Sequence, residues 1–259
     1  MITGQILRDA ILSGANNIAN QRTRVDELNV FPVPDGDTGT NMSMTVGAAR
    51  RELEALPDTC TVEEASKTAA SAMLRGARGN SGVILSLLFR GIAKSLKGRE
   101  TASAAEFAAA VSAGVDAAYK AVMKPAEGTI LTVARAVADS AQDFAVRQTD
   151  FSALLPRMIE SGNETLKRTP DLLPVLKEAG VVDSGGAGLM AIYLGYKMAV
   201  DGEEIENVSD IAKNLTALME KPAAQIEAGA ATGAASDAGG EIEFGYCTET
   251  FITPLKEGT

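Results

Sequence analysis

Asp35 and Asp37, separated by one glycine, are the residues of this sequence with the clearest capacity for chemistry. Two carboxylates at this spacing can point at one hard cation, and oxygen ligands of this kind suit Mg²⁺, which bridges phosphate oxygens. Asn29, just upstream, offers a further oxygen. The pattern also resembles the start of an EF-hand loop, but Val46 stands where that loop requires its final glutamate. The pair therefore predicts a magnesium site that holds a phosphate group.

Three more loops share the glycine-rich or acidic character of the segment DGDTGTN. The four loops are Asp35 to Asn41, Gly76 to Gly82, Glu127 to Thr129 and Val182 to Gly188. Any one of them is typical of an ordinary helix cap. Each, however, stands at the start of a predicted helix, and these are alternate helices along the chain. If neighbouring helices are antiparallel, the four loops converge at one end, where free backbone N–H groups favour a phosphate.

Helical periodicity dominates the chain up to about residue 200, with almost no alternating strand pattern. We therefore predict an all-α fold of eight helices, with short connections that favour antiparallel neighbours. A short satellite is expected at 172–178. The eight predicted helices cover residues 3–20, 40–56, 61–76, 81–96, 101–123, 129–146, 151–168 and 185–200.

The sequence changes character after residue 205. Residues 206–240 read as a helix followed by an Ala/Gly-rich linker, and within residues 241–259 the segment 241–253 alternates like a strand that is too short to fold alone. We therefore predict one helical domain over 1–205, a connecting segment over 206–240, and, over 241–259, the truncated start of a middle domain that this chain does not contain.

Composition excludes several classes of function. The net charge of −10 disfavours binding to nucleic acid, and no apolar run is long enough to cross a membrane. Only two cysteines are present, which fits a reducing cytoplasmic setting. Histidine is absent, so Ser-His-Asp triads, Cys-His dyads and His-ligated zinc are excluded for the chain as given. No GxxxxGK[ST] motif occurs, which argues against a P-loop enzyme.

Four motifs in order resemble the N-terminal, ATP-binding domain of the kinase component of bacterial fatty acid kinase, a domain similar to the nucleotide-binding subunit of dihydroxyacetone kinase. They are LNVFPVPDGDTGTNM, GARGNSGVILS, KPAEGTILTVA and VVDSGGAGL, beginning at Leu28, Gly76, Lys124 and Val181. The resemblance covers about residues 1–205. The segment FGYCTE, from Phe244, is similar to the opening of that protein's middle domain, and Cys247 in it resembles a zinc ligand whose partners this chain lacks.

The resemblance implies an eight-helix antiparallel up-and-down barrel that binds ATP and two Mg²⁺ ions at one rim. It implies that Asp35, Asp37 and Asn29 are metal ligands, the two aspartates being the catalytic residues. The dihydroxyacetone kinase relatives have a histidine where this chain has Thr38, and they have a nucleotide-contacting arginine before the last motif with no clear counterpart here. The residues implied to face the nucleotide are Thr38, Gly39, Thr40, Asn41, Asn80, Ser81, Gly82, Thr129, Asp183, Ser184 and Gly185.

The absence of histidine bears on the phosphate acceptor. A carboxylate acceptor is already ionised at neutral pH and needs no general base, whereas an alcohol does. The resemblance implies that a fatty acid is brought by a separate fatty-acid-binding carrier protein and leaves as an acyl phosphate, with a homodimer possible through domains outside this chain. Two alternatives stay open: a nucleotide-binding subunit like that of dihydroxyacetone kinase, and a nucleotide-binding regulatory module that does no chemistry.

Overall fold

The computed structural model describes residues 1–148, 150–203 and 205–208, all within one compact unit, and the regular structure of these residues is helical. Three short helices accompany eight long ones: α2 (Arg22–Asp26), α9 (Thr169–Leu172) and α10 (Pro174–Ala179). The long helices are α1 (Gly4–Asn20), α3 (Thr38–Glu54), α4 (Val62–Arg75), α5 (Gly79–Ser95), α6 (Ala104–Ala121), α7 (Ile130–Arg147), α8 (Phe151–Lys167) and α11 (Ser184–Val200).

The long helices confirm the predicted all-α fold, and each lies where periodicity places it. The predicted satellite at 172–178 is two short helices, because Pro174 begins the second of them. Helix α2 was not predicted, since five residues are too few for a periodic pattern. The predicted linker at 206–240 and the strand fragment at 241–259 lie almost wholly outside the described residues.

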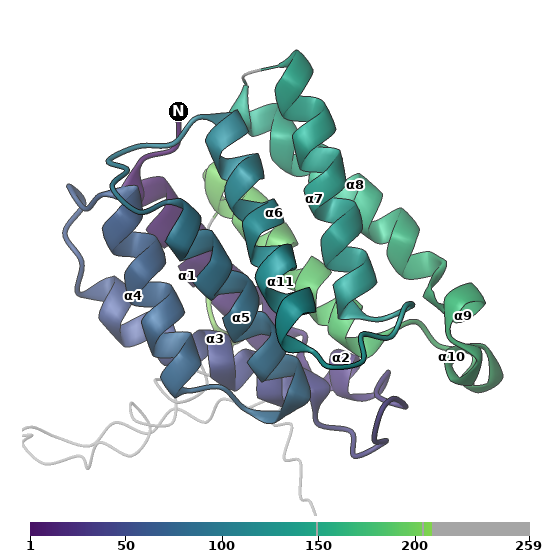
Figure 1. Cartoon of the computed structure of the whole chain (residues 1–259). Helices are drawn as coiled ribbons and strands as arrows, with labels where there is room; N and C mark the ends of the chain where they lie inside the picture. Colours follow the sequence, from purple (N-terminus) through teal and green to yellow (C-terminus); the bar gives the residue numbers. More distant parts are fainter. Residues whose placement is uncertain (149, 204, 209–259) are drawn as a thin grey trace, which may run out of the picture. The chain divides into compact units, whose positions relative to one another are not determined.

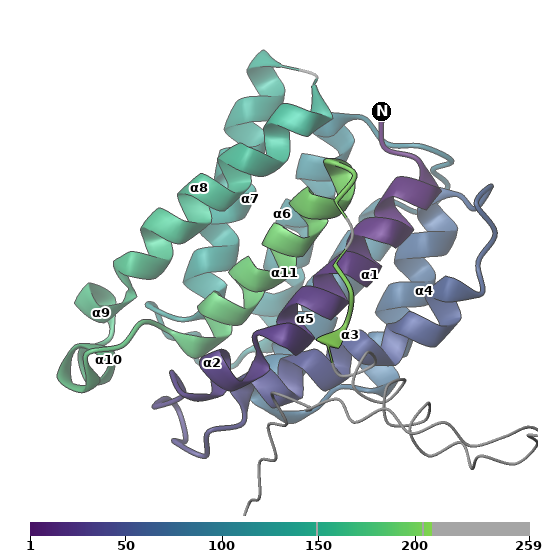
Figure 2. The same ribbon diagram turned by 180° about the vertical axis from the view of Figure 1, so that it is seen from behind.

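The long helices pack side by side in sequence order, and α11 closes the ring by packing against both α1 and α8 (Figures 1 and 2). The closure depends on two glycines. A Cβ added at Gly195 of α11 would lie 2.6 Å from the Cα of Gly14 in α1 and 2.7 Å from the carbonyl oxygen of Ser13. Only glycine at this crossing lets the two helix backbones approach so closely.

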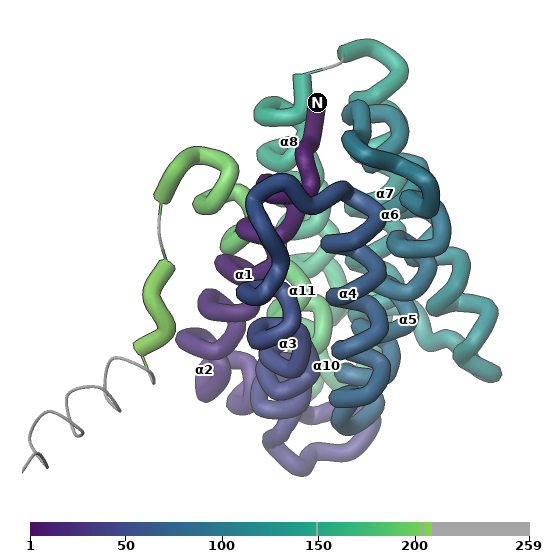
Figure 3. Tube along the Cα trace, turned by 90° about the vertical axis from the view of Figure 1, so that its left-hand side faces the viewer, coloured from purple at the N-terminus to yellow at the C-terminus, as the bar shows by residue number. Residues whose placement is uncertain are grey.

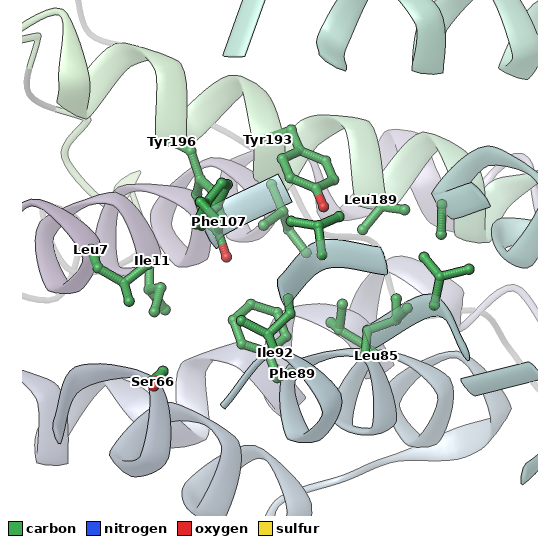
Figure 4. A pocket seen from close by; sticks show the side chains of 15 residues that line it. Leu7, Ile11, Ser66, Leu85, Phe89, Ile92, Phe107, Leu189, Tyr193 and Tyr196 are labelled. Carbon is green, nitrogen blue, oxygen red and sulfur yellow. The ribbon is translucent and has the colours of Figure 1, made fainter. Parts of the chain in front are cut away.

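The ring surrounds one apolar core, with a small internal cavity of about 30 Å³ that has room for one or two water molecules. Tyr193 and Tyr196 of α11 lie across this cavity from Phe89 and Ile92 of α5 (Figure 4). The interior is therefore filled by side chains and is no open channel. In the part of the chain that the structure describes, no helix is long and apolar enough to span a membrane.

After α11 the chain runs back beside α1 (Figures 2 and 3). Asn16 donates from its side-chain amide to the carbonyl of Ile205, at 2.7 Å, and Asn20 donates to the carbonyl of Glu206, at 2.9 Å. The backbone N–H of Val208 in turn donates to Asn20 Oδ1. Because Asn20 is the last residue of α1, this segment returns to the end of the ring where α3 and α11 begin.

Candidate functional site

The four loops singled out in the sequence meet at one end of the ring. The first and last of them are joined by Ser184, whose hydroxyl donates to Thr38 Oγ1 at 3.2 Å. Both side chains are buried, although they stand at the starts of helices that are far apart in sequence. The starts of α3 and α11 are therefore adjacent.

The second loop is locked to α3. Thr45 Oγ1 accepts a hydrogen bond from the backbone N–H of Arg78 and donates to the carbonyl of Asn41, at 3.1 and 2.7 Å. Gly79 has a positive φ of 56°, and a Cβ there would lie 2.3 Å from Asn41 Nδ2. Glycine is needed at this position both for its backbone conformation and for the close approach of the Asn41 side chain.

The third loop is joined to the fourth by Asp183, the N-cap residue of α11. Its carboxylate accepts from the backbone N–H of Gly186, at 2.6 Å, and from that of Ile130 at the start of α7. The carboxyl group is almost fully buried, and this burial raises its pKa from 3.8 to about 6, against the opposing effect of the two backbone donors. Asp183 thus acts in this structure as a buried connection between two helix starts.

The third loop, the EGT turn from Glu127 to Thr129, is also held by bonds to side chains of α6 and α7. Glu127 forms a two-pronged salt bridge with Arg135, with bonds of 3.0 and 2.6 Å, and accepts from Thr132 Oγ1 at 2.8 Å. Partial burial would raise the pKa of Glu127, but the hydrogen bonds from Arg135, Thr132 and Tyr119 lower it overall. The guanidinium of Arg135 lies 5.2 Å from the ring centre of Tyr119, in a cation–π contact.

The acidic loop begins with a direct contact between two of the predicted metal ligands. Asn29 Nδ2 donates to Asp35 Oδ1 at 2.7 Å, while Asn29 Oδ1 is buried and has no hydrogen-bond partner among the described residues. Burial raises the pKa of Asp37; the nearby Asp35 carboxyl adds to this rise and a hydrogen bond with Asn41 opposes it. A buried oxygen without a donor and two neighbouring carboxyl groups fit a divalent cation.

Asp37 is the N-cap residue of α3, yet its side chain does not cap the helix. Asp26 of α2 does so in its place: its carboxylate accepts from the backbone N–H and the hydroxyl of Thr40, at 2.9 and 2.8 Å. The Asp37 carboxyl group is therefore not used as a helix cap, and its hydrogen bonds are with the side chains of Asn41 and Asp35. Sequence reasoning missed Asp26, because no local spacing links it to Thr40.

The long helices differ in how they begin. Side chains of their own N-cap residues cap α1, α4, α6, α8 and α11, through Thr3, Thr61, Ser103, Asp150 and Asp183. By contrast, α3, α5 and α7 have no such bond. Asp26 takes the Thr40 N–H of α3 and Asp183 takes the Ile130 N–H of α7, so the first N–H groups of α5 and those left over at α3 and α7 are the ones that can face an anion.

Fourteen residues were predicted for this site, and the structure places all of them in these four loops or beside them. Asp35 and Asn80 are exposed. Within the described ranges, no group of three or more His, Cys, Asp or Glu side chains could hold a metal ion. The half-buried members are Asp37, Thr40, Asn41, Ser81 and Thr129, and the buried members are Asn29, Thr38, Gly39, Gly82, Asp183, Ser184 and Gly185.

Residues 32–197, which include all four loops but not Asn29 just before them, match the DAK2 domain family. The chain belongs to this family. The DAK2 match spans every long helix from α3 to α8 and nearly all of α11.

Several proteins resemble the whole chain or most of it. The protein YloV of Bacillus subtilis is 45% identical over 251 residues, which is 97% of this chain and 44% of YloV. An uncharacterized protein of Staphylococcus epidermidis is 50% identical over 205 residues, 79% of this chain and 37% of that protein. The chain therefore spans less than half the length of these relatives.

The fold of the DAK2 domain is also found in solved structures. The dihydroxyacetone kinase of C. freundii, solved in complex with AMP-PNP and Mg²⁺, matches 74% of this chain and 33% of its own, with a TM-score of 0.57 and 14% identity. The native form of that enzyme gives a TM-score of 0.54 at 16% identity. At these identities the likeness shows a shared helical fold.

Proposed function

We propose that this DAK2 domain binds Mg–ATP at the rim formed by the four loops and donates the terminal phosphate to an acceptor. One observation carries the proposal: α3, α5 and α7 begin at this rim without a cap from their own N-cap side chains, and although Asp26 takes one N–H of α3 and Asp183 one of α7, the other early N–H groups stay available. Beside them lie the carboxyl groups of Asp35 and Asp37. Phosphate oxygens would accept from such N–H groups, and cations would bind such carboxylates.

The residues of the rim would have different roles in binding Mg–ATP. Asn29, Asp35 and Asp37 would hold two Mg²⁺ ions, which supply neutralising charge for the phosphates. The starts of α3 and α5, with Thr38 to Asn41 and Asn80 to Gly82, would bind the phosphate oxygens. Thr129 and Ser184 would border the nucleotide, whereas Asp183 would hold their two helices in register. In phosphoryl transfer, positioning and charge neutralisation of this kind account for most of the catalysis.

For the acceptor, we propose the carboxylate of a fatty acid presented by a separate carrier protein. The chain has no histidine, and the carboxyl groups at the rim that are not assigned to metal already accept hydrogen bonds: Asp26 from Thr40, Glu127 from Arg135, and Asp183 from two backbone N–H groups. A carboxylate acceptor needs no base: its ionised oxygen attacks the terminal phosphorus, the bond to the bridging oxygen of ADP breaks, and an acyl phosphate forms. Further domains of the longer relatives would dock the carrier or pair two protomers.

The acceptor is tested by ATP consumption in the full-length protein. Oleate-loaded carrier protein is compared with dihydroxyacetone and its own carrier. We expect ADP and an acyl phosphate, trapped as a hydroxamate, only with the fatty acid. Turnover with dihydroxyacetone would assign the alternative acceptor, and ATP binding without turnover on either would make the domain a regulatory module.

The metal site has a separate test. Asp35→Ala is expected to abolish Mg–ATP binding measured by calorimetry. Asp116→Ala, which removes an exposed carboxylate from the middle of α6, is the matched control and should bind as the wild type does. Unchanged affinity in Asp35→Ala would refute the assignment of this carboxylate to the metal.

A further inference from the structure

A groove between α4 and α5 carries an unusual concentration of positive charge for so acidic a chain. It has a volume of about 410 Å³. Four exposed cations line it, Lys67 from α4 and Arg90, Lys94 and Lys97 from α5, with one carboxylate, Glu63, at the end where α4 begins. The net charge of the whole chain is −10, so the groove is opposite in sign to the chain as a whole.

The four cationic side chains form no salt bridge with the described residues. None of them takes part in an ion pair there, whereas Arg8, Arg75, Arg99, Arg135 and Arg157 each contact a carboxylate. Glu63 is itself occupied, because its carboxylate accepts from the backbone N–H of Gly98 at 2.9 Å. Unpaired like charges so close together repel one another, and an acidic partner would relieve this repulsion.

The shape of the groove selects among acidic partners. Ala70, which is buried, and Ala93, which is half-buried, line it below the exposed cations and form its floor, and Leu74, 51% exposed, lines it near the end of α4. Apolar residues on the floor with cations along the sides match a helix that has an apolar stripe flanked by carboxylates. A flat anionic membrane would reach the cations but not the floor, and the chain's net negative charge opposes it.

We propose that the α4–α5 groove docks an acidic amphipathic helix of a partner protein. Lys67 would pair with carboxylates on one side of that helix, Arg90 and Lys94 with those on the other, and Leu74 would contact its apolar stripe. The contact is independent of the phosphoryl-transfer reaction proposed above, because no rim residue lines this groove.

The probe is a fluorescent helical peptide of about 16 residues, about 24 Å long, with leucine and alanine on one stripe and glutamate on both flanks. Its binding to the full-length protein is followed by fluorescence anisotropy. We expect saturable binding that weakens as salt rises above about 0.1 M, where charges are screened beyond about 10 Å. Arg90→Glu/Lys94→Glu should weaken it about tenfold or more, and Leu74→Ser should weaken it without changing its salt dependence.

Lys120→Glu/Arg147→Glu is the matched control, because it changes the net charge equally at exposed cations outside the groove. It should leave binding unchanged, and a scrambled peptide of the same composition should not bind. Three results would overturn the proposal: both double variants weaken peptide binding equally, the scrambled peptide binds as well as the probe, or the probe does not bind at all. So would cosedimentation with phosphatidylglycerol vesicles in place of peptide binding, which would indicate a membrane, or salt-sensitive self-association, which would indicate a second copy.

Discussion

The side-chain amide of Asn29 donates to Asp35 Oδ1 at 2.7 Å and leaves its own oxygen buried without a donor. The two residues come from different sides of the turn that precedes α3, and this contact places the side-chain amide of Asn29 beside the first carboxylate of the acidic loop. An unpaired buried oxygen costs about 1–3 kcal/mol, so its presence is explained if a cation binds there.

Asn29→Ala is therefore expected to weaken Mg–ATP binding about tenfold, because it removes one oxygen ligand and the donor that orients Asp35. Calorimetric titration measures the affinity, and thermal unfolding without ligand checks that the fold is intact. Asn163→Ala removes an exposed asparagine of α8 and serves as control. Equal affinities for both variants would show that Asn29 takes no part in the site.

We expect two glycine-to-alanine substitutions, one at the crossing that closes the ring and one elsewhere, to change stability in opposite directions. Gly195→Ala should lower the free energy of unfolding by about 1–3 kcal/mol, since the new methyl group meets the backbone of Ser13 and Gly14. Gly47→Ala lies inside α3 with nothing within 4 Å of the added Cβ, and should raise it by about 0.5–1 kcal/mol. Urea denaturation measures both. A stabilised Gly195→Ala would show that α1 and α11 can separate without cost.

The EGT turn depends on a buried hydroxyl. Thr132 Oγ1 accepts from the N–H of Gly128 and donates to Glu127, both at 2.8 Å. Thr132→Val keeps the shape but leaves the buried Gly128 N–H without an acceptor, so we expect a loss of about 1–3 kcal/mol in the free energy of unfolding. Thr68→Val in α4, where the threonine is half-buried, is the control and should change stability by less than about 0.5 kcal/mol.

Because the carboxyl group of Asp183 is buried, we expect the stability of the protein to depend on pH. Burial raises its pKa from 3.8 to about 6 in the folded protein, so between these values the folded state binds more protons than the unfolded state. Its contribution to stability is complete below about pH 4 and is lost as the pH rises through about 6, a change of about 3 kcal/mol.

Asp183→Asn retains a good N-cap and removes the ionisation, so its stability should be flatter across this pH range. Urea denaturation at a series of pH values gives the comparison with the wild type. Asp150→Asn changes the exposed N-cap of α8 in the same way and should leave the slope as it is in the wild type. An unchanged slope in Asp183→Asn would mean that other groups cause the pH dependence.

The sequence by itself determined the secondary structure and the order of the site loops. Helical periodicity and caps such as Thr61 with Glu64 are local properties, and they located the eight long helices. Alternation of antiparallel helices then placed the four loops at one end. Short elements such as α2 carry too few residues for a period, so the sequence did not reveal them.

Only the tertiary structure decided which groups are free to act. Three contacts show this: Asp26 caps α3 in place of Asp37, Ser184 donates to Thr38, and Asp183 is buried between two helix starts. These contacts join segments that are far apart in the chain or have no characteristic spacing. No local pattern encodes them, because they depend on how closely the helices approach once the ring closes. The physical reason is the packing at crossings such as Gly14 with Gly195, which fixes those distances.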